Sequence, residues 1–397
     1  MAKKVVLAYS GGLDTSVAVR WMVEHLGCEV LCLSADVGQD GTLEGNRDKA
    51  LGAGATIYEQ LDLREEFARD YLAPIIKANA LYEGQYPLVS ALSRPLIVKH
   101  QVEMARRHGA DGIAHGCTGK GNDQVRFEVS SMALAPDLEL VAPVRNWGFT
   151  REDSIAYAAQ HGIPVSATKE KMYSIDDNQW GRAIECGEME DPWATPPDGV
   201  WEMTKLTAVE GRDVVIGFEA GVPVSVDGTA MPLHELIVAL NGIVGAYGWG
   251  RLDMVENRRV GIKSRETYEA PAALAIMAAH ADLESITLER DLQREKIRLQ
   301  HRYAELVYDG LWFSPLRSAL DAFIDESQCF VTGEVRLRLK PGECFVTGRR
   351  SPHSLYDYGL ATYDAADRFR HADSEGFVQL WGLSLKTWSA VQGHGRS

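Results

Sequence analysis

Cysteine is scarce in this sequence, and long apolar runs are absent from it. The 397 residues include six cysteines, none in a C-x-x-C pair or near a histidine at metal-binding spacing. A disulfide framework or a zinc site would need such pairs, so we predict reduced thiols. No stretch of about 18 apolar residues is present, so we predict no membrane-spanning helix. The first polar residues lead directly into an apolar run, and we expect a cytoplasmic protein with no cleaved leader.

Positive charge is also in short supply. Lysine and arginine number 41 against 56 aspartates and glutamates, which gives a formal net charge of −15 at pH 7. Proteins that bind nucleic acids normally carry a basic patch for phosphate contacts, so this balance argues against a nucleic-acid partner. Small anions are not excluded, because screening over about 8 Å at physiological salt lets a locally positive pocket act.

The length and the composition indicate an ordinary globular protein with more than one domain. Hydrophobic residues make up 45% of the chain and charged residues 24%. A chain of this length exceeds one ordinary hydrophobic core. We therefore expect two domains with extensions.

The most informative stretch is SGGLDTS at residues 10–16. The apolar run at 5–9 before it predicts a buried parallel strand, and apolar residues on a helical period at 15–26 predict a helix. A glycine turn between the two aims backbone N–H groups and a helix N-terminus at one point, which suits a phosphate or a pyrophosphate. The turn has no lysine and one carboxylate, Asp14. We therefore expect backbone amides and a bound Mg²⁺ to supply the positive electrostatic field that attracts the anion.

Two interpretations of this turn compete. It is either an ordinary serine-capped turn in a nucleotide-free α/β domain or an anion-binding loop. The pattern SGGxDxS is more specific than a lone GxGxxG, and it differs from the GxxxxGK[ST] loop. It resembles the pyrophosphate loop of the ATP pyrophosphatases, which cleave ATP between the α and β phosphates. We favour this second interpretation.

Four further strands are predicted at 29–35, 56–61, 111–115 and 138–142, with helices between them. This alternation predicts a Rossmann-like parallel sheet that ends at a domain boundary near 165–170. We expect a helix at 64–80, kinked or broken at Pro74, and a helix that begins at Thr150 with Asp153 in its capping box. Ala35 ends the second strand, where it is either a contact of a nucleotide base or a small core residue.

A second glycine-rich stretch, HGCTGKGNDQVR, occupies residues 115–126. Its backbone is expected to pass close to another group, and Asn122 or Asp123 to cap the next helix. Lys120 and Arg126 can bind carboxylates or phosphates, whereas the neighbouring Asn122 and Asp123 can receive an ammonium group. This set suits a zwitterionic amino acid beside a nucleotide, and a solvated polar loop is the alternative.

The second half has a different pattern and predicts an α+β domain. We expect hairpins at 214–226 and 252–263, the second with its turn at 256–258, and helices at 232–246, 270–282, 286–310 and 314–327. An apolar stripe on the charged helix is expected to face the core: Ile286, Leu288, Leu292, Ile297, Leu299 and Tyr303. The apolar segment FVQLWGL at 377–383 predicts an arm that docks on another subunit or on its own chain.

Six motifs, in this order along the chain, resemble the argininosuccinate synthase family. They are AYSGGLDTS at 8–16, YPLVSALSRP at 86–95, HGCTGKGNDQVRFE at 115–128, YSID at 173–176, MVENRRVGIKSRETYEAP at 254–271 and SLYD at 354–357. The resemblance spans nearly the full length. It implies ATP- and Mg²⁺-dependent condensation of L-citrulline with L-aspartate to argininosuccinate, AMP and pyrophosphate, usually in a homotetramer. The acidic charge and the lack of long apolar runs lead us to expect no nucleic-acid or membrane partner.

The resemblance also implies a fold and a domain division. The fold class is α/β: a Rossmann-like parallel-sheet nucleotide-binding domain of the ATP-pyrophosphatase type, then an α+β synthetase domain used in multimerisation, then an oligomerisation tail. We place these parts at residues 1–167, 168–364 and 365–397.

Site residues follow from the resemblance position by position. ATP is implied at Ala8, Tyr9, Ser10, Gly11, Gly12, Leu13, Asp14, Thr15, Ser16, Ala35 and Gly116. L-Aspartate is implied at Thr118, Asn122 and Asp123, and L-citrulline at Tyr86, Asn122, Arg126, Ser174, Ala183, Glu256 and Tyr268. Asp14, Lys120 and Asp123 are the candidate catalytic residues. Arg126 is expected to pair with the citrulline carboxylate, and Glu256 to receive an ammonium or ureido N–H. The ligands of Mg²⁺ are not assigned.

Two positions depart from the family pattern. Many relatives carry serine in place of Ala183, and some in place of Ala91, so each alanine removes one possible hydrogen bond to citrulline, worth about 0.5–1.5 kcal/mol.

Two rival functions are an ATP pyrophosphatase that acts on another acceptor, such as a tRNA uridine, and a catalytically silent nucleotide-binding regulator. The acidic charge and the scattered cysteines disfavour the first rival, and the intact polar positions disfavour the second.

Overall fold

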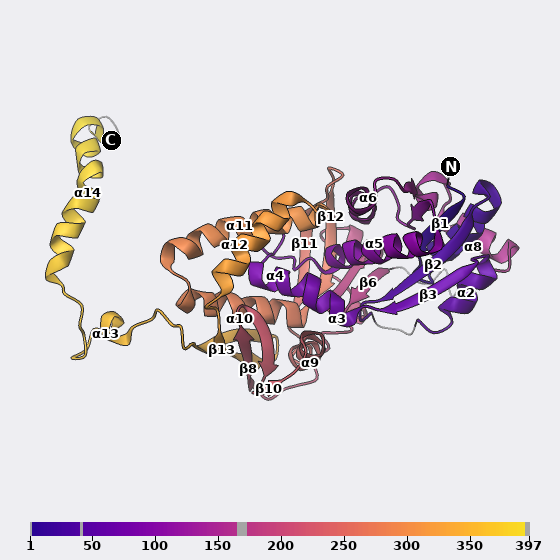
Figure 1. Ribbon diagram of the computed structural model, residues 1–397. Helices are drawn as coiled ribbons and strands as arrows, with labels where there is room; N and C mark the ends of the chain where they lie inside the picture. The colour runs from indigo at the N-terminus through magenta and orange to yellow at the C-terminus, as the bar shows by residue number, and fades with distance from the viewer. Residues whose placement is uncertain (1, 40–42, 165–172, 394–397) are drawn as a thin grey trace. The chain divides into compact units, whose positions relative to one another are not determined.

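The computed structural model describes residues 2–39, 43–164 and 173–393 (Figure 1). The chain forms two compact units, Met1–His353 and Ser354–Ser397. The domain boundary predicted near 165–170 falls outside the described residues, and the predicted division into three parts stays a prediction. Among the described residues, no helix is both long and apolar enough to cross a membrane.

A five-stranded parallel sheet opens the first unit, as predicted. Its strands are β1 (Lys4–Ala8), β2 (Glu29–Asp36), β3 (Ile57–Asp62), β4 (Gly112–Ala114) and β5 (Glu139–Val141), in the order β3-β2-β1-β4-β5. Successive side chains of a strand point to opposite faces. Val5 and Leu7 therefore join one hydrophobic cluster, and Val6 joins another on the opposite face. Burial on both faces explains why the strand sequence is continuously apolar.

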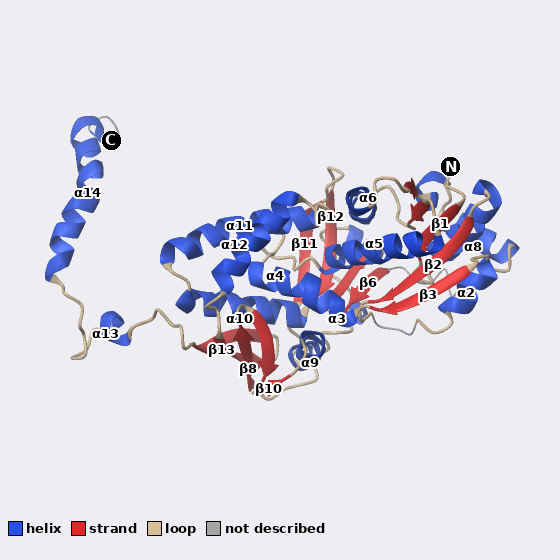
Figure 2. Ribbon diagram, in the orientation of Figure 1, coloured by secondary structure: helices blue, strands red, loops and turns tan. Residues whose placement is uncertain are grey.

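Helices cover both faces of this sheet (Figure 2). One face carries α1 (Leu13–Trp21), which runs on into a π-helical turn at Met22–Leu26, α2 (Asn46–Ala53) and α8 (Arg151–Gln160). The other face carries α5 (Val89–His108) and the end of α6 (Asp123–Leu134). Helix α5 also contacts β6 (Ser174–Asn178) and β7 (Gly181–Glu185) of the next sheet. The short α7 spans Pro143–Asn146. Thr150 and Asp153 form the predicted capping box of α8.

The predicted helix at 64–80 is divided into three segments. These are α3 (Arg64–Glu66), a π-helical segment at Phe67–Leu72 and α4 (Ala73–Ala78). Pro74 stands in the first turn of α4, where its missing N–H costs no helical hydrogen bond. The backbone at Leu72 and Ala73 stays helical, so the proline marks the point where the π-helical segment passes into α4.

Two antiparallel sheets and four long helices follow. One sheet contains β8 (Arg212–Glu219), β9 (Val222–Val226), β10 (Thr229–Ala230), β13 (Gly333–Lys340) and β14 (Glu343–Arg350) in the order β10-β9-β8-β13-β14. The other contains β6 (Ser174–Asn178), β7 (Gly181–Glu185), β11 (Arg251–Asn257) and β12 (Lys263–Glu269) in the order β11-β12-β7-β6. The long helices are α9 (Leu233–Gly245), α10 (Pro271–Thr287), α11 (Arg290–Tyr308) and α12 (Pro315–Gln328). Short 3₁₀ turns lie at Gly187–Glu190 and Asp198–Val200.

Two predictions for this region are wrong in detail. The second hairpin turns later than predicted, because Glu256 and Asn257 belong to β11 and the Arg258 N–H bonds the Ile262 carbonyl at 2.9 Å. In the stripe on α11, Ile297 is 46% exposed and does not belong to the core, whereas Tyr303 is fully buried.

The second unit contains α13 (Tyr358–Ala361) and α14 (Ala372–Gln392). No residue of α14 is buried, and its apolar side chains, among them Phe377, Leu380 and Trp381, are exposed. The docking partner of this helix stays a prediction.

Candidate active site

Residues 10–12 form a tight turn between β1 and α1, and residues 13–16 are the first residues of α1. Gly11 has a φ of +77°, a left-handed conformation that favours glycine. Gly12 occupies the N-cap position of α1, and no side chain caps the helix there. The Gly12 N–H donates to the Ser10 hydroxyl at 3.3 Å, and that hydroxyl lies 3.2 Å from the Thr15 hydroxyl. An uncapped helix start offers its first N–H groups to an anion.

Asn46, at the start of α2, packs against this turn. Its side-chain amide donates to the Ser10 carbonyl at 3.3 Å, and the residue is only 4% exposed. A Cβ atom on Gly11 would overlap the Asn46 side chain. Gly11 is therefore required twice, by its backbone conformation and by its neighbour.

The turn lies at the switch point of the parallel sheet. β1 has β2 on one side and β4 on the other, and ligands of such sheets bind outside the carboxyl ends of the strands where the order reverses. The loop after β4 meets the turn here, because a Cβ on Gly116 would lie 2.8 Å from Thr15 Cγ2. Ala35 lies near the carboxyl end of β2. The strand order thus groups the residues predicted for ATP.

His115 orders the loop after β4. Its Nδ1 accepts a hydrogen bond from the Cys117 N–H at 3.2 Å, so the proton of a neutral ring is on Nε2. Nε2 faces Glu128 at 3.1 Å, and Arg145 contacts the same carboxylate at 2.6 Å. The hydrogen bond from His115 and the charge of Arg145 lower the pKa of Glu128. The loop is therefore fixed from behind by an ionised carboxylate.

A cavity of about 390 Å³ opens beside these two loops. It is lined by Ser10 and Gly116 of the residues predicted for ATP, and by all of the residues predicted for the amino acids: Tyr86, Thr118, Asn122, Asp123, Arg126, Ser174, Ala183, Glu256 and Tyr268. These side chains come from both halves of the first unit. The fold therefore brings the predicted nucleotide and amino-acid residues into one space, and what each of them binds stays a prediction.

Two arginines hold Asp123. Arg94 donates to its Oδ2 at 2.6 Å, and Arg126 donates to its Oδ1 at 2.8 Å. Arg94 also donates to Asp176 at 2.7 Å. Burial acts to raise the pKa of Asp123, but the two arginines outweigh it and lower that pKa. Asp123 is therefore a carboxylate that orients both guanidinium groups.

Asn122 differs from its predicted role at the helix start. It occupies the N-cap position of α6, but neither it nor Asp123 caps the helix with its side chain. Asn122 Oδ1 accepts from the Arg259 N–H at 2.9 Å, and Nδ2 donates to the Tyr308 hydroxyl at 2.8 Å. The predicted start of the helix is right, and the predicted side-chain cap is wrong because long-range partners take the amide.

Aromatic hydroxyls surround Glu256, which is 3% exposed. Tyr268 donates to its Oε2 at 3.0 Å, and Tyr308 donates to its Oε1 at 2.7 Å. Burial raises the pKa of Glu256, against the effect of these bonds and of Arg126. The Tyr86 ring stacks on Tyr268 with 4.3 Å between the centroids.

Two further carboxyl groups, of Glu185 and Glu266, face Arg258 in the lining of the cavity. Arg258 donates to Glu185 at 2.8 Å and also to Glu266. Burial raises the pKa of both carboxyl groups, and the charge of a neighbouring glutamate raises each pKa further.

Several predicted residues lie outside the lining of this cavity. The Ser16 hydroxyl is buried and lies 2.9 Å from the Tyr9 hydroxyl, so it faces the core. We expected it to face an anion bound at the turn. Lys120 is exposed on its loop, where its carbonyl accepts a bond from Arg258 at 3.4 Å. Ala91 is buried in the core, and the neighbouring Ser90 lines the cavity instead. Of the two departures from the family pattern, only Ala183 therefore borders the cavity.

Sequence reasoning did not single out several residues that line the cavity: Ser90, Arg94, Cys117, Ile175, Asp176, Glu185, Arg258 and Glu266. Arg94, Asp176 and Arg258 fall inside the motifs YPLVSALSRP, YSID and MVENRR, so position within a motif was the available signal. Asn46 lies in no such motif, and nothing in the sequence indicated its contact with Gly11.

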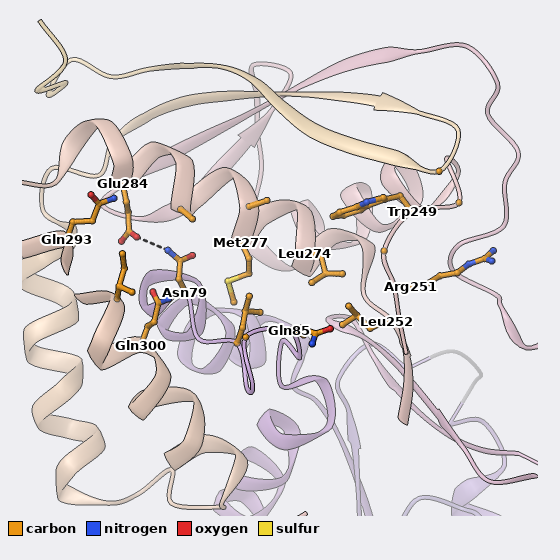
Figure 3. Close-up of a pocket in the computed structure, with 18 residues that line it drawn as sticks. Asn79, Gln85, Trp249, Arg251, Leu252, Leu274, Met277, Glu284, Gln293 and Gln300 are labelled. Carbon is orange, nitrogen blue, oxygen red and sulfur yellow. Dashed lines mark hydrogen bonds between the residues drawn. The ribbon is translucent and has the colours of Figure 1, made fainter. Parts of the chain in front are cut away.

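A larger cavity of about 780 Å³ lies elsewhere (Figure 3). Its walls are mainly apolar, with Leu274 and Met277 of α10 between the bonded pair Asn79 and Glu284 and the ring of Trp249. None of the residues that line it is a predicted site residue. The smaller cavity holds the charged and hydroxyl groups that bond-forming chemistry requires, and we take it as the candidate active site.

Two family models match this chain. Residues 4–164 match the family described as "Arginosuccinate synthase N-terminal HUP domain", and residues 173–388 match "Arginosuccinate synthase C-terminal domain". The parallel sheet and these family matches define the class: an ATP-using ligase with a HUP-type nucleotide-binding domain.

Full-length relatives narrow the class to one family. The chain is 57% identical over 392 residues to the argininosuccinate synthase of Rubrobacter xylanophilus, covering 98% of this chain and 96% of the relative. It is 55% identical over 394 residues to that of Symbiobacterium thermophilum, covering 98% of each. The chain belongs to the argininosuccinate synthase family. A solved 4-thiouridine synthetase bound to RNA and ATP has 19% identity and a TM-score of 0.31 over 41% of each chain, too little to carry an argument.

Proposed function

We propose that the turn at 10–16 and the cavity beside it condense L-citrulline with L-aspartate, using ATP, through a citrullyl-adenylate intermediate. The observation that supports this most strongly is the lining of one cavity by Ser10 and Gly116 and by every residue predicted for the two amino acids. An enzyme that joins three substrates needs such a shared space. Alignment of reactants in one site can contribute on the order of 7–11 kcal/mol to lowering a barrier.

The chemistry requires activation of the ureido group. Its carbonyl is a poor electrophile, because the oxygen is a bad leaving group. Attack of that oxygen on the α-phosphorus of ATP forms an O–P bond and releases pyrophosphate. The aspartate amine then attacks the ureido carbon, AMP leaves with the former ureido oxygen, and one amine proton is released. No protein nucleophile is needed.

The turn at 10–16 is proposed to hold the leaving pyrophosphate. The backbone N–H groups at the uncapped start of α1 and the hydroxyls of Ser10 and Thr15 are its donors. Each hydrogen bond to an ionised oxygen is worth about 1.5–3 kcal/mol. These donors are fixed before the reaction, because Gly11 and Asn46 lock the turn.

Mg²⁺ is proposed as the partner of ATP. Within the described residues, no group of three histidines, cysteines, aspartates or glutamates is placed to hold a metal ion. This suits an ion carried mainly by phosphate oxygens and water, with Asp14 as the one carboxylate of the turn near it. When bound, the ion would neutralise the charge of the departing pyrophosphate.

The charge of the cavity supports zwitterionic substrates. Three guanidinium groups, of Arg94, Arg126 and Arg258, face five carboxyl groups: Asp123, Asp176, Glu185, Glu256 and Glu266. The ammonium group of each amino acid can pair with a carboxylate of the cavity, and the carboxylates of the amino acids can pair with the guanidinium groups. We assign the citrulline carboxylate to Arg126, and an ammonium or ureido N–H to Glu256. Aspartate is assigned to the region of Thr118, Asn122 and Asp123, with Asn122 also contacting citrulline.

We further propose that the protein acts in the cytoplasm as a homotetramer. The exposed apolar side chains of α14 support an assembly in which this helix is covered.

The function is tested by following both halves of the reaction with labelled substrate. Citrulline carrying ¹⁸O in its ureido group is incubated with ATP and Mg²⁺, with and without aspartate, and pyrophosphate, AMP and argininosuccinate are measured. We expect pyrophosphate release to require citrulline, and AMP to appear with one ¹⁸O atom only when aspartate is added. ADP as the nucleotide product, or AMP without the label, would contradict the proposal.

A further inference from the structure

Tyr308, the last residue of α11, contacts four residues predicted for the amino acids without lining the cavity. It bonds Asn122 and Glu256, its ring lies 5.0 Å from the Arg126 guanidinium carbon, and it packs edge-on to Tyr86 with 6.3 Å between the centroids. The residue is only 1% exposed. It therefore stands behind the cavity wall, at the point where α6, β11 and the turn before α5 meet.

The direction of each hydrogen bond in this group is fixed. The backbone N–H of Arg259 can only donate, so it must face Asn122 Oδ1, at 2.9 Å. Asn122 Nδ2 therefore faces Tyr308 and donates to its oxygen at 2.8 Å. The Tyr308 proton is then directed to Glu256 Oε1 at 2.7 Å. One hydroxyl thus sets the orientation of an amide and of a carboxylate at the same time.

The ring of Tyr308 is held in place by aromatic and backbone contacts. Tyr82 stacks on it with 3.6 Å between the centroids and 5° between the planes, and the Tyr82 hydroxyl donates to the Asn257 carbonyl at 2.7 Å. The Tyr308 carbonyl accepts from Arg126 Nε at 3.2 Å. These contacts fix the hydroxyl without using it.

Gly310 allows α11 to end against α6. It has a φ of +77°, and a Cβ on it would lie 2.9 Å from Arg126 Cα. Only glycine accepts both the left-handed conformation and this close approach without strain. The end of α11 is thereby pressed against the residues that Tyr308 contacts.

We propose that Tyr308 is a positioning residue for citrulline, acting through Asn122 and Glu256. The proposal rests on the proposed function, because it assumes that these two side chains bind citrulline. The hydroxyl holds each of them in the rotamer that faces the cavity and satisfies one polar atom of each. Without it, one Asn122 N–H and one Glu256 oxygen lose their partner in a buried place, and both side chains gain freedom to turn.

The test compares two tyrosine-to-phenylalanine variants of the full-length protein. Tyr308→Phe removes the hydroxyl and keeps the ring on Tyr82. Tyr303→Phe is the matched control: it lies on the same helix, is equally buried, and its hydroxyl donates to Asp321 at 2.7 Å. KM values for citrulline, aspartate and ATP, kcat, and the thermal midpoint are measured for each variant and for the parent.

We expect Tyr308→Phe to raise the KM for citrulline about tenfold, equivalent to about 1.4 kcal/mol of binding, and to change the KM for ATP less than twofold. Tyr303→Phe should leave all three KM values within twofold, with a similar shift of the thermal midpoint. An unchanged citrulline KM in Tyr308→Phe would overturn the proposal. So would a rise of all three KM values by one factor.

A double-mutant cycle checks the route through the carboxylate. Tyr308→Phe is combined with Glu256→Gln, and citrulline binding to each folded variant is measured by calorimetry. If Tyr308 acts through Glu256, the two effects on affinity are less than additive; fully additive effects would overturn the proposal. Failure here differs from failure of the proposed function, because the parent enzyme would still form argininosuccinate and AMP.

Discussion

Gly11→Ala tests whether the turn at residues 10–16 depends on its backbone conformation. Holding an alanine at a φ of +77° costs on the order of 1 kcal/mol. The new methyl group would also overlap the Asn46 side chain and force it from the Ser10 carbonyl. Because Asn46 is almost fully buried, leaving its amide unpaired costs about 1–3 kcal/mol more. If the turn keeps its shape, we expect the free energy of unfolding to fall by about 2–4 kcal/mol in total.

Gly12→Ala is the matched control for this prediction. Gly12 has an ordinary φ of −77°, and its Cβ would lie 3.4 Å from the Ser10 hydroxyl oxygen, a normal contact. Thermal unfolding and the KM for ATP are measured for both variants. Gly11→Ala should lower the thermal midpoint and raise the KM for ATP, whereas Gly12→Ala should keep the midpoint near that of the parent. Equal midpoints for the two variants would refute the reasoning.

Three further changes address the cavity and the tail. Arg126→Ala should raise the KM for citrulline well above any effect on ATP, and steady-state kinetics showing the reverse would reject its placement at the citrulline carboxylate. Arg94→Gln removes a cation that lowers the pKa of Asp123, so the acid limb of the kcat/KM profile should move to higher pH. A lowered carboxyl pKa gives stability above the unfolded pKa of about 3.9 that is lost as the pH falls through the folded value. Arg94→Gln should therefore lose more stability at neutral pH than at acid pH, and an equal loss at both would count against this pairing. Deletion after Asp364 should lower the mass seen by light scattering, and an unchanged mass would show that the tail is not needed for assembly.

Local patterns predicted the parallel sheet because its inner strands β1, β2 and β4 are buried on both faces. The run at 5–9 is apolar at every position, and the structure divides it between two clusters, Val5 and Leu7 on one face and Val6 on the other. Glycine and capping signals also placed the turn at 10–16 and the start of α8 correctly. Such features depend on neighbours within a few residues, which a sequence displays directly.

The antiparallel region was predicted less well. The hairpin of β13 and β14 was missed, although Val335, Leu337 and Leu339 alternate with charged residues and Pro341-Gly342 marks its turn. The hairpin of β11 and β12 was shifted, although Gly261, with a φ of +91°, marks its true turn. In both hairpins a glycine in the turn marks the boundary between the strands more clearly than an apolar run does.

Long-range partners of polar side chains could not be predicted from the sequence. Asn122 carries a helix-start signal, yet its amide bonds Tyr308 and Arg259, which lie 186 and 137 residues away. Burial of these groups makes an unpaired polar atom costly, so tertiary partners outweigh the local cap. The positioning role proposed for Tyr308 has no signal in the sequence for the same reason.

The pairing around Arg126 limits how it can bind a carboxylate. Its Nε donates to the Tyr308 carbonyl and one Nη donates to Asp123, so two of its five N–H groups are used. A ligand carboxylate can therefore be bound only through the remaining hydrogens of the two Nη atoms. It would approach the end of the guanidinium group that lies away from Nε. Because Asp123 and Asp176 together balance the charges of Arg94 and Arg126, little Coulomb energy is gained on binding, and the fixed direction of these hydrogens must provide the discrimination. Lysine at this position would keep the charge but lose both anchors, so the geometry requires arginine.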